Sequence, residues 1–146
     1  MRTRALPART ARPILPSQNP LNSQAKALLT ARAALDKQAE GVVVMDLRGR
    51  SSVTDFFVVC TAASSRQIAA LQEHLSRALA QRGCRVWHTE GAASSAGVRR
   101  GRVHELEWVL MDCGDIVVHL LDQPARAFYR LEELWADAPR LSVGSG

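Results

Sequence analysis

Two short apolar segments separated by a turn constrain the fold of this chain more than any other feature. Residues 42–45 read VVVM and residues 53–61 read VTDFFVVCT. Both are rich in β-branched or aromatic residues, which favour strands, and the first is too short for a helix. Both segments are apolar on both faces, which is typical of strands covered on both sides. The sequence therefore predicts a central, covered β-sheet, with a turn at residues 48–50 between these strands.

Three segments with helical periodicity surround these strands. The first is expected to run from residue 23 to a stop at Gly41, with an apolar stripe formed by Leu28, Ala31, Leu35 and Ala39. The second begins at Ser64, which forms a capping-box pattern with Gln67. Its apolar stripe consists of Ile68, Leu71, Leu75 and Leu79. The third has Pro124 in its first turn, and its predicted apolar face consists of Phe128, Leu131, Leu134 and Trp135.

The remaining segments complete a mixed sheet. Strands are expected at residues 85–88, 106–112 and 115–121, and a tight type I′ turn at Cys113-Gly114 would join the last two. Residues 91–101 are small, polar and basic and lack periodicity, which predicts a loop. The order of elements predicts an α/β fold: a mixed sheet of about five strands flanked by helices.

The charge of the chain is concentrated at its start. The net charge is +5, yet residues 1–22 contain four arginines and no acid, so the rest holds 15 basic against 14 acidic residues. Nucleic-acid-binding domains usually carry a basic patch of their own, so RNA binding by the folded part is weakly supported. The start is either a disordered basic extension, which we favour, or an organelle transit peptide. No apolar run approaches the roughly 20 residues of a membrane span.

No arrangement of reactive residues predicts catalysis. Cys60, Cys84 and Cys113 are widely spaced without a C-x-x-C pair, so we read Cys60 and Cys113 as small buried hydrophobes in a reducing compartment. Nucleophilic chemistry would need a histidine and an acid to converge on Cys60, Ser64 or Ser65, and no spacing among the four histidines predicts this. We expect no enzyme activity, cofactor or metal.

A pair of aspartates beside the predicted hairpin turn is the nearest approach to a metal site. Asp112 and Asp115 would face each other if the hairpin forms, and two carboxylates there could bind a cation. The alternative, which we favour, is that aspartates at hairpin ends accept hydrogen bonds from backbone N–H groups.

Aromatic residues near the end of the chain suggest an interaction surface. Phe128 and Tyr129 are adjacent on the last predicted helix, so they cannot both point at one spot in the core. Trp108 lies in a strand where alternation lets it face either way. His119 lies among apolar residues and is expected to be half-buried and hydrogen-bonded. At least one of these aromatics is expected to face solvent, as interface anchors do.

Four segments resemble the ribosomal silencing factor (iojap-like) family. They are residues 51–59 (SSVTDFFVV), 61–67 (TAASSRQ), 107–119 (EWVLMDCGDIVVH) and 126–135 (RAFYRLEELW). The resemblance extends over roughly residues 24–141. It implies a nucleotidyltransferase-like α/β fold without the catalytic carboxylates, and a tendency to form homodimers. It also implies binding to ribosomal protein fourteen of the large subunit, which blocks subunit joining and represses translation.

The resemblance also implies a set of partner-binding residues: Trp108, Asp115, His119, Arg126, Tyr129 and Glu132. Asp55 and Arg66 are weaker candidates. Organelle relatives imply an alternative role in assembly of the large subunit, and the fold leaves a nucleotidyltransferase-like enzyme as a further alternative. We expect the protein to be cytoplasmic, or mitochondrial or plastid if the start is a transit peptide.

Two segments depart from the family pattern. Residues 91–105 are longer than the usual link and add Arg99, Arg100 and Arg102, which either reach ribosomal RNA or form a solvated loop, the reading that we favour. The arginine-rich start is the other departure. The predicted organisation is a basic extension at residues 1–22, the silencing-factor domain at 23–141 and a flexible tail at 142–146.

Overall fold

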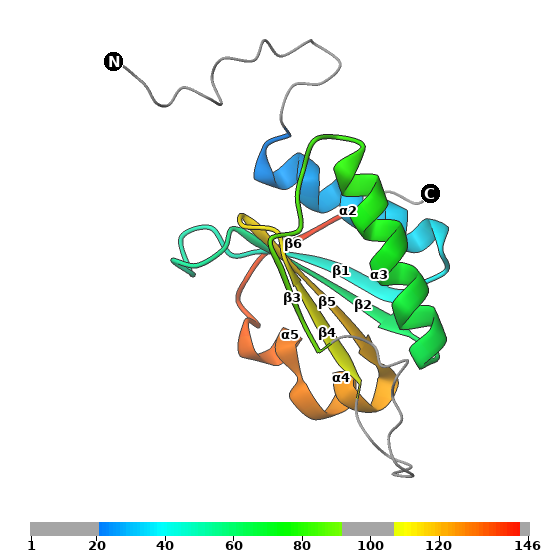
Figure 1. Ribbon diagram of the computed structural model, residues 1–146. Helices are drawn as coiled ribbons and strands as arrows, with labels where there is room; N and C mark the ends of the chain where they lie inside the picture. Colours follow the sequence, from blue (N-terminus) through cyan, green and yellow to red (C-terminus); the bar gives the residue numbers. More distant parts are fainter. Residues whose placement is uncertain (1–20, 92–106, 144–146) are drawn as a thin grey trace.

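A mixed β-sheet with helices on both faces forms the fold (Figure 1). The computed structural model of the chain describes residues 21–91 and 107–143. Its elements follow in the order α2 (Ser23–Asp36), β1 (Glu40–Asp46), β2 (Phe56–Ala62), α3 (Ser65–Ala80), β3 (His88–Glu90), β4 (Trp108–Asp112), β5 (Ile116–Asp122), α4 (Gln123–Tyr129), α5 (Leu131–Leu134) and β6 (Arg140–Leu141). The predicted α/β class is confirmed, with six strands among the described residues instead of about five.

The strand order is β3-β4-β5-β2-β1-β6, with β2 and β5 at the centre. These two strands are parallel, whereas the other neighbours are antiparallel. Nearly every residue of β2 and β5 is buried, because helices cover both faces of the sheet there. The prediction of a covered central strand is therefore confirmed for residues 56–61. The sixth strand, β6, is only two residues long and pairs with β1 at the edge.

The two faces of the sheet bear separate hydrophobic cores. Helices α2 and α3 cover one face, and α4 and α5 cover the other (Figure 1). Alternation along β2 sends Val58 and Cys60 toward α2 and α3, and sends Phe57 and Val59 toward α4 and α5. We call these the α2–α3 face and the α4–α5 face.

Helix α3 follows its sequence pattern closely. Ser64 Oγ accepts a hydrogen bond from the backbone N–H of Gln67 at 3.1 Å. Gln67 Oε1 in turn accepts from the N–H of Ala63 at 2.6 Å, one residue before the position that a capping box specifies. All four members of the predicted stripe are fully buried: Ile68, Leu71, Leu75 and Leu79. Both the cap and the apolar face are confirmed.

Helix α2 differs from its prediction in length and orientation. It ends at Asp36, and Gln38 takes a positive φ of 66°, so the helix does not reach Gly41. Gly41 instead lies in β1, where the pairing with β2 is irregular. Leu35 is 38% exposed, whereas the buried residues of α2 are mostly alanines: Lys26, Ala27, Thr30, Ala31, Ala33 and Ala34. Of the predicted stripe, Ala31 and Ala39 are buried and Leu28 packs partly against the core, so the prediction is wrong for Leu35 alone.

The hairpin between β4 and β5 turns one residue later than predicted. The N–H of Cys113 donates to the carbonyl of Ile116 at 2.9 Å, so Gly114 and Asp115 are the central residues. Gly114 has a φ of +91° while Asp115 does not share a positive φ, which fits a type II′ turn and not type I′. Asp112 pairs with Val117, so the two aspartates do not face each other.

The last helix is interrupted at Arg130. This residue adopts a left-handed conformation with φ 50° and ψ 51°, which separates α4 from α5. Phe128 is 68% exposed and Leu134 is 70% exposed, so the prediction that they belong to a continuous core face is wrong. Leu131 and Trp135 do pack partly against the α4–α5 face. Most of the predicted basic extension, the loop arginines Arg99, Arg100 and Arg102, and residues 144–146 lie outside the described residues.

Candidate interaction surface

Sheet register brings Trp108 and His119 together on the α4–α5 face. Trp108 pairs with Leu121, and Leu110 pairs with His119, so Trp108 and His119 are diagonal neighbours on adjacent strands. Helix α4 begins immediately after β5, where Asp122 caps it by accepting from the N–H of Ala125 at 2.9 Å. This short connection returns the chain over the same face. The rings of Trp108 and Tyr129 consequently lie with their centroids 4.3 Å apart.

His119 contacts the Trp108 ring of this pair, with centroids 5.7 Å apart. The indole Nε1–H of Trp108 donates to His119 Nδ1 at 3.0 Å. The ring of Phe57 meets the imidazole edge-on from within the sheet, with centroids 4.4 Å apart. Only 3% of His119 is exposed, and this burial lowers its pKa to about 4. The predicted hydrogen bond is confirmed, but the residue is almost fully buried, not half-buried.

Phe128 and Tyr129 give this face an exposed apolar region. Phe128 is 68% exposed and Tyr129 is 40% exposed, and their rings meet edge-to-face with centroids 5.0 Å apart. Ala125 is the one buried residue of α4, so the helix presents most of its surface to solvent. Trp108 is partly buried beside Tyr129. We call Trp108, Phe128 and Tyr129 the aromatic surface, and the expectation that an aromatic residue here faces solvent is confirmed.

An ion pair between Arg126 and Glu132 joins α4 to α5. The guanidinium of Arg126 donates to both carboxylate oxygens of Glu132, at 2.6 and 3.1 Å, and to Thr61 Oγ1 on β2 at 2.6 Å. Their side chains are only 13% and 28% exposed. The hydrogen bond from Arg126 holds the pKa of Glu132 below its usual value. A Cβ on Gly41 would lie 3.2 Å from Arg126 Nη1, so the lack of a side chain at residue 41 leaves space for the guanidinium.

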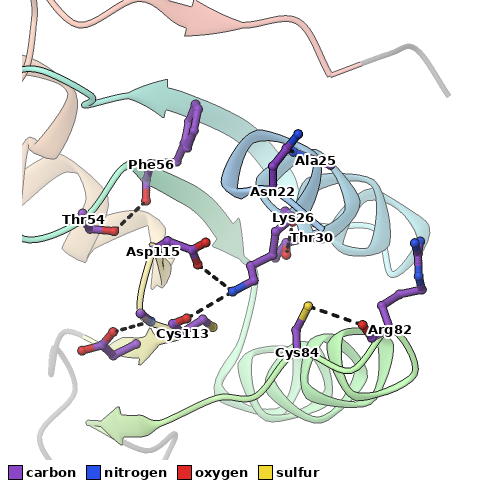
Figure 2. A network of polar contacts seen from close by, with 12 residues as sticks. Asn22, Ala25, Lys26, Thr30, Thr54, Phe56, Arg82, Cys84, Cys113 and Asp115 are labelled. Atoms are coloured by element: carbon purple, nitrogen blue, oxygen red, sulfur yellow. Dashed lines mark hydrogen bonds and ion pairs between the residues drawn. The ribbon is translucent and has the colours of Figure 1, made fainter. Parts of the chain in front are cut away.

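Asp115, the sixth predicted partner-binding residue, lies apart from the other five. It precedes β5, four residues before His119, which corresponds to roughly 13 Å along an extended strand. Its carboxylate accepts from the ammonium of Lys26 on α2 at 2.6 Å, and the same ammonium donates to the carbonyl of Cys113 at 3.3 Å (Figure 2). The structure therefore assembles Trp108, His119, Arg126, Tyr129 and Glu132, and leaves Asp115 in a different environment.

Asp115 lines an open pocket of about 630 Å³, together with the weaker candidate Asp55. Lys26 and Arg85 also line it, so its charged groups balance. Trp87, which is 72% exposed, stands at this pocket, and sequence reasoning did not single it out. Its segment is short and lacks periodicity, so no pattern indicated which side chains face solvent. Arg66 is exposed on α3, away from both locations.

The cysteines and the aspartate considered for nucleophilic or metal chemistry are buried in the core or bonded to the backbone. Burial raises the pKa of both Cys60 and Cys113 to about 12, so these thiols stay protonated at neutral pH. Asp112 accepts from the backbone N–H of Gly114 at 2.9 Å, as the favoured alternative predicted. In the described part of the chain, no three histidine, cysteine, aspartate or glutamate side chains gather in a way that could hold a metal ion. Nor does any helix there have the length and apolarity to cross a membrane.

Comparison with known proteins identifies the family. The model of the family described as "Ribosomal silencing factor during starvation" matches residues 20–145. The ribosomal silencing factor RsfS of Halalkalibacterium halodurans is 33% identical over 123 residues, 84% of this chain and 96% of that protein. RsfS of Bacillus subtilis is 32% identical over 126 residues, covering 86% and 98% of the two chains.

A solved structure agrees with this result. A crystal structure of a protein from Chromobacterium violaceum superposes with a TM-score of 0.69 at 28% identity, covering 86% of this chain and 95% of that one. The fold, the four sequence segments and the relatives all indicate the same family. This chain belongs to the ribosomal silencing factor family.

Proposed function

We propose that this protein docks on the large ribosomal subunit through ribosomal protein fourteen and sterically blocks joining of the small subunit. Family membership supports a role in repressing translation at the ribosome. The observation that carries the docking proposal is the aromatic surface, in which Phe128 and Tyr129 remain 68% and 40% exposed beside Trp108. Exposed apolar groups that lie together on a folded domain mark interaction sites.

The composition of this surface suits a protein partner. Trp and Tyr are enriched among residues that dominate binding energy at interfaces. The aromatic surface is bordered by charged side chains of α4 and α5, including Arg130 and Glu133, both of which are exposed. An apolar centre with a polar rim is the usual anatomy of a protein interface. A standard interface buries about 800 Å² on each partner, which one sheet face and a short helix pair can provide.

The partner-binding residues divide into contacts and supports. Tyr129 and Trp108 are the proposed anchors, with Phe128 beside them. Arg126 and Glu132 are largely occupied with each other and with Thr61, so they act by holding α5 against α4. Asp115 would have to contact a separate part of the partner, because it lies at the other end of β5.

The mechanism needs occupancy and no turnover. A protein bound at the subunit-joining face excludes the small subunit for as long as it stays bound, and its effect depends on its concentration relative to its dissociation constant. The aromatic surface fits this role without an activated nucleophile or a cofactor. We place the protein in the cytoplasm, where the ribosomes that it would silence assemble.

Subunit joining measured by sedimentation tests the proposal. Purified large and small subunits are mixed with the wild type or with the Trp108→Ala/Tyr129→Ala variant, whose folding is checked by circular dichroism. We expect the wild type to keep the subunits apart and the variant to let them join. If the wild type binds large subunits yet joining proceeds normally, blocking is wrong and the alternative role in large-subunit assembly takes its place.

A further inference from the structure

We infer that His119 is a positioning residue of the aromatic surface, which fixes the orientation of Trp108 from beneath and does not itself touch the partner. The inference rests on the proposed docking function. The family resemblance groups His119 with the partner-binding residues, yet it is only 3% exposed and its ring contacts Trp108 of the aromatic surface. A residue so deeply buried acts on a partner through its neighbours.

The contact between His119 and Trp108 defines the orientation of both rings. An indole has a single hydrogen-bond donor, and here it points at His119 Nδ1 at 3.0 Å. The two ring planes are tilted by 36° with centroids 5.7 Å apart, so the bond runs between ring edges and the rings do not stack face to face. Phe57 packs against the imidazole at 69° and limits its rotation. Trp108 is therefore held at a fixed angle to the sheet.

The bond also determines where His119 carries its proton. Because Nδ1 accepts from Trp108, the neutral imidazole must carry its hydrogen on Nε2. Nε2 is itself buried and has no hydrogen-bond partner. A protonated imidazole would place a second hydrogen on Nδ1, facing the indole N–H, and the bond would be lost. The depressed pKa of His119 agrees with this arrangement, since the neutral form accepts the bond at physiological pH.

The orientation of Trp108 extends to the exposed part of the surface. Its ring lies 4.3 Å from that of Tyr129, which in turn contacts Phe128 at 5.0 Å. If the indole lost its acceptor, it would either leave a half-buried donor unpaired or rotate toward water. Rotation would displace the support under Tyr129. The three rings thus form one chain of contacts that begins at the buried imidazole.

Two amide substitutions separate positioning from simple core filling. In His119→Asn the side-chain oxygen is attached to Cγ, as Nδ1 is, and can accept from the indole. In His119→Gln the amide reaches further and its oxygen corresponds to the Nε2 position. Both variants are polar and both leave the packing against Phe57 imperfect. We therefore expect Asn, and not Gln, to preserve the orientation of Trp108.

An NMR measurement on the free protein tests the contact directly. The indole N–H resonance of Trp108 is assigned by its loss in Trp108→Phe. We expect it at a hydrogen-bonded chemical shift in the wild type and in His119→Asn, and at a solvent-exposed shift in His119→Gln. Equal shifts in the two amide variants, with both folded, would overturn the positioning role without touching the proposed function.

A double-mutant cycle on large-subunit binding completes the test. Dissociation constants for purified large subunits are measured for the wild type, His119→Gln, Trp108→Phe and the double variant. Since one hydrogen bond is at stake, we expect His119→Gln to weaken binding about fivefold and to have no further effect when Trp108 is already Phe. Equal weakening in both backgrounds would make His119 a merely structural residue. No binding by the wild type would instead overturn the proposed function itself.

Discussion

The two faces of the sheet are covered by helices in very different ways. On the α2–α3 face, α3 buries four large apolar side chains completely and α2 adds a close-packed row of alanines. On the α4–α5 face, α4 buries only Ala125 and α5 buries no residue fully. Phe128 and Leu134 point away from the sheet although they are among the largest apolar side chains of these helices. One face is thus closed and the other is left incomplete.

In the proposed function, this difference assigns stability to one face and binding to the other. Burying one large apolar side chain typically stabilises a fold by about 1.5–3 kcal/mol. Phe128 and Leu134 do not contribute this stabilisation, because both are exposed. The α2–α3 face supplies the packing that keeps the domain folded without them. The α4–α5 face keeps its aromatic side chains available, held in place by polar contacts of Arg126 and His119.

The largest contrast is expected from the same substitution on each face. Leu75→Ala removes a fully buried side chain from α3 and should lower the free energy of unfolding by about 3 kcal/mol. Leu134→Ala removes a side chain that is 70% exposed on α5 and should change it by less than about 0.5 kcal/mol. Urea titration followed by circular dichroism measures both. Similar losses in the two variants would show that the α4–α5 face is as closed as the other.

Removing Arg126 tests whether polar contacts hold the open face together. Arg126→Ala abolishes the two hydrogen bonds to Glu132 and the one to Thr61. We expect the free energy of unfolding to fall by about 2–3 kcal/mol, because the guanidinium is largely buried. Hydrogen exchange by local opening should appear in α5, whereas α3 should still exchange only through global unfolding. A uniform change across both helices would contradict a local role, and Arg77→Ala, which removes an exposed ion pair on α3, is the control.

Acid should destabilise the protein through His119. Its pKa is about 4 in the folded chain and near the ordinary 6.5 when unfolded, so between these values the unfolded state binds the extra proton. Stability is therefore full above pH 7 and falls as the pH drops, by about 2 kcal/mol between pH 7 and pH 5. Urea titrations across this range should show the loss in the wild type and not in His119→Asn. An identical pH dependence in both would contradict the burial of a neutral imidazole.

Phe128 is expected to affect binding and hardly to affect stability. Because its ring is 68% exposed, Phe128→Ala should change the free energy of unfolding by less than about 0.5 kcal/mol. Binding to large subunits should nevertheless weaken about tenfold, since the ring belongs to the aromatic surface. Pelleting with purified subunits measures this. Unchanged binding would remove Phe128 from the proposed interface.

The α2–α3 face was largely predictable from sequence, because the signals for α3 are local. The stripe of α3 repeats large aliphatic residues at spacings of three and four, and its Ser64 cap is a local signal. In α2, Ala34 is buried and Leu35 is exposed, which depends on the space available beside α3 and the sheet. Such space is a property of the tertiary structure, and the periodicity of one segment does not contain it.

For the α4–α5 face, the sequence predicted which residue types are exposed but not how they are arranged. The adjacency of Phe128 and Tyr129 required that one of them leave the core, and this held. The break at Arg130 could not be foreseen, because a left-handed conformation is uncommon for a residue other than glycine and nothing in this segment signals it. The partner of Asp115 was equally unpredictable, because Lys26 lies 89 residues earlier in the chain. The distance of Asp115 from the aromatic surface, in contrast, follows from its place four residues before His119.

Calorimetric titration of isolated ribosomal protein fourteen tests the central claim most directly. Three forms of this protein are compared: the wild type, Trp108→Ala/Tyr129→Ala, and Leu35→Ala, which alters an exposed leucine on α2 across the sheet. We expect the wild type and Leu35→Ala to bind equally, and the double variant to bind at least about thirtyfold more weakly, as loss of an interface anchor implies. Equal binding by all three forms, or no binding by the wild type, would contradict the account of the α4–α5 face as the docking surface.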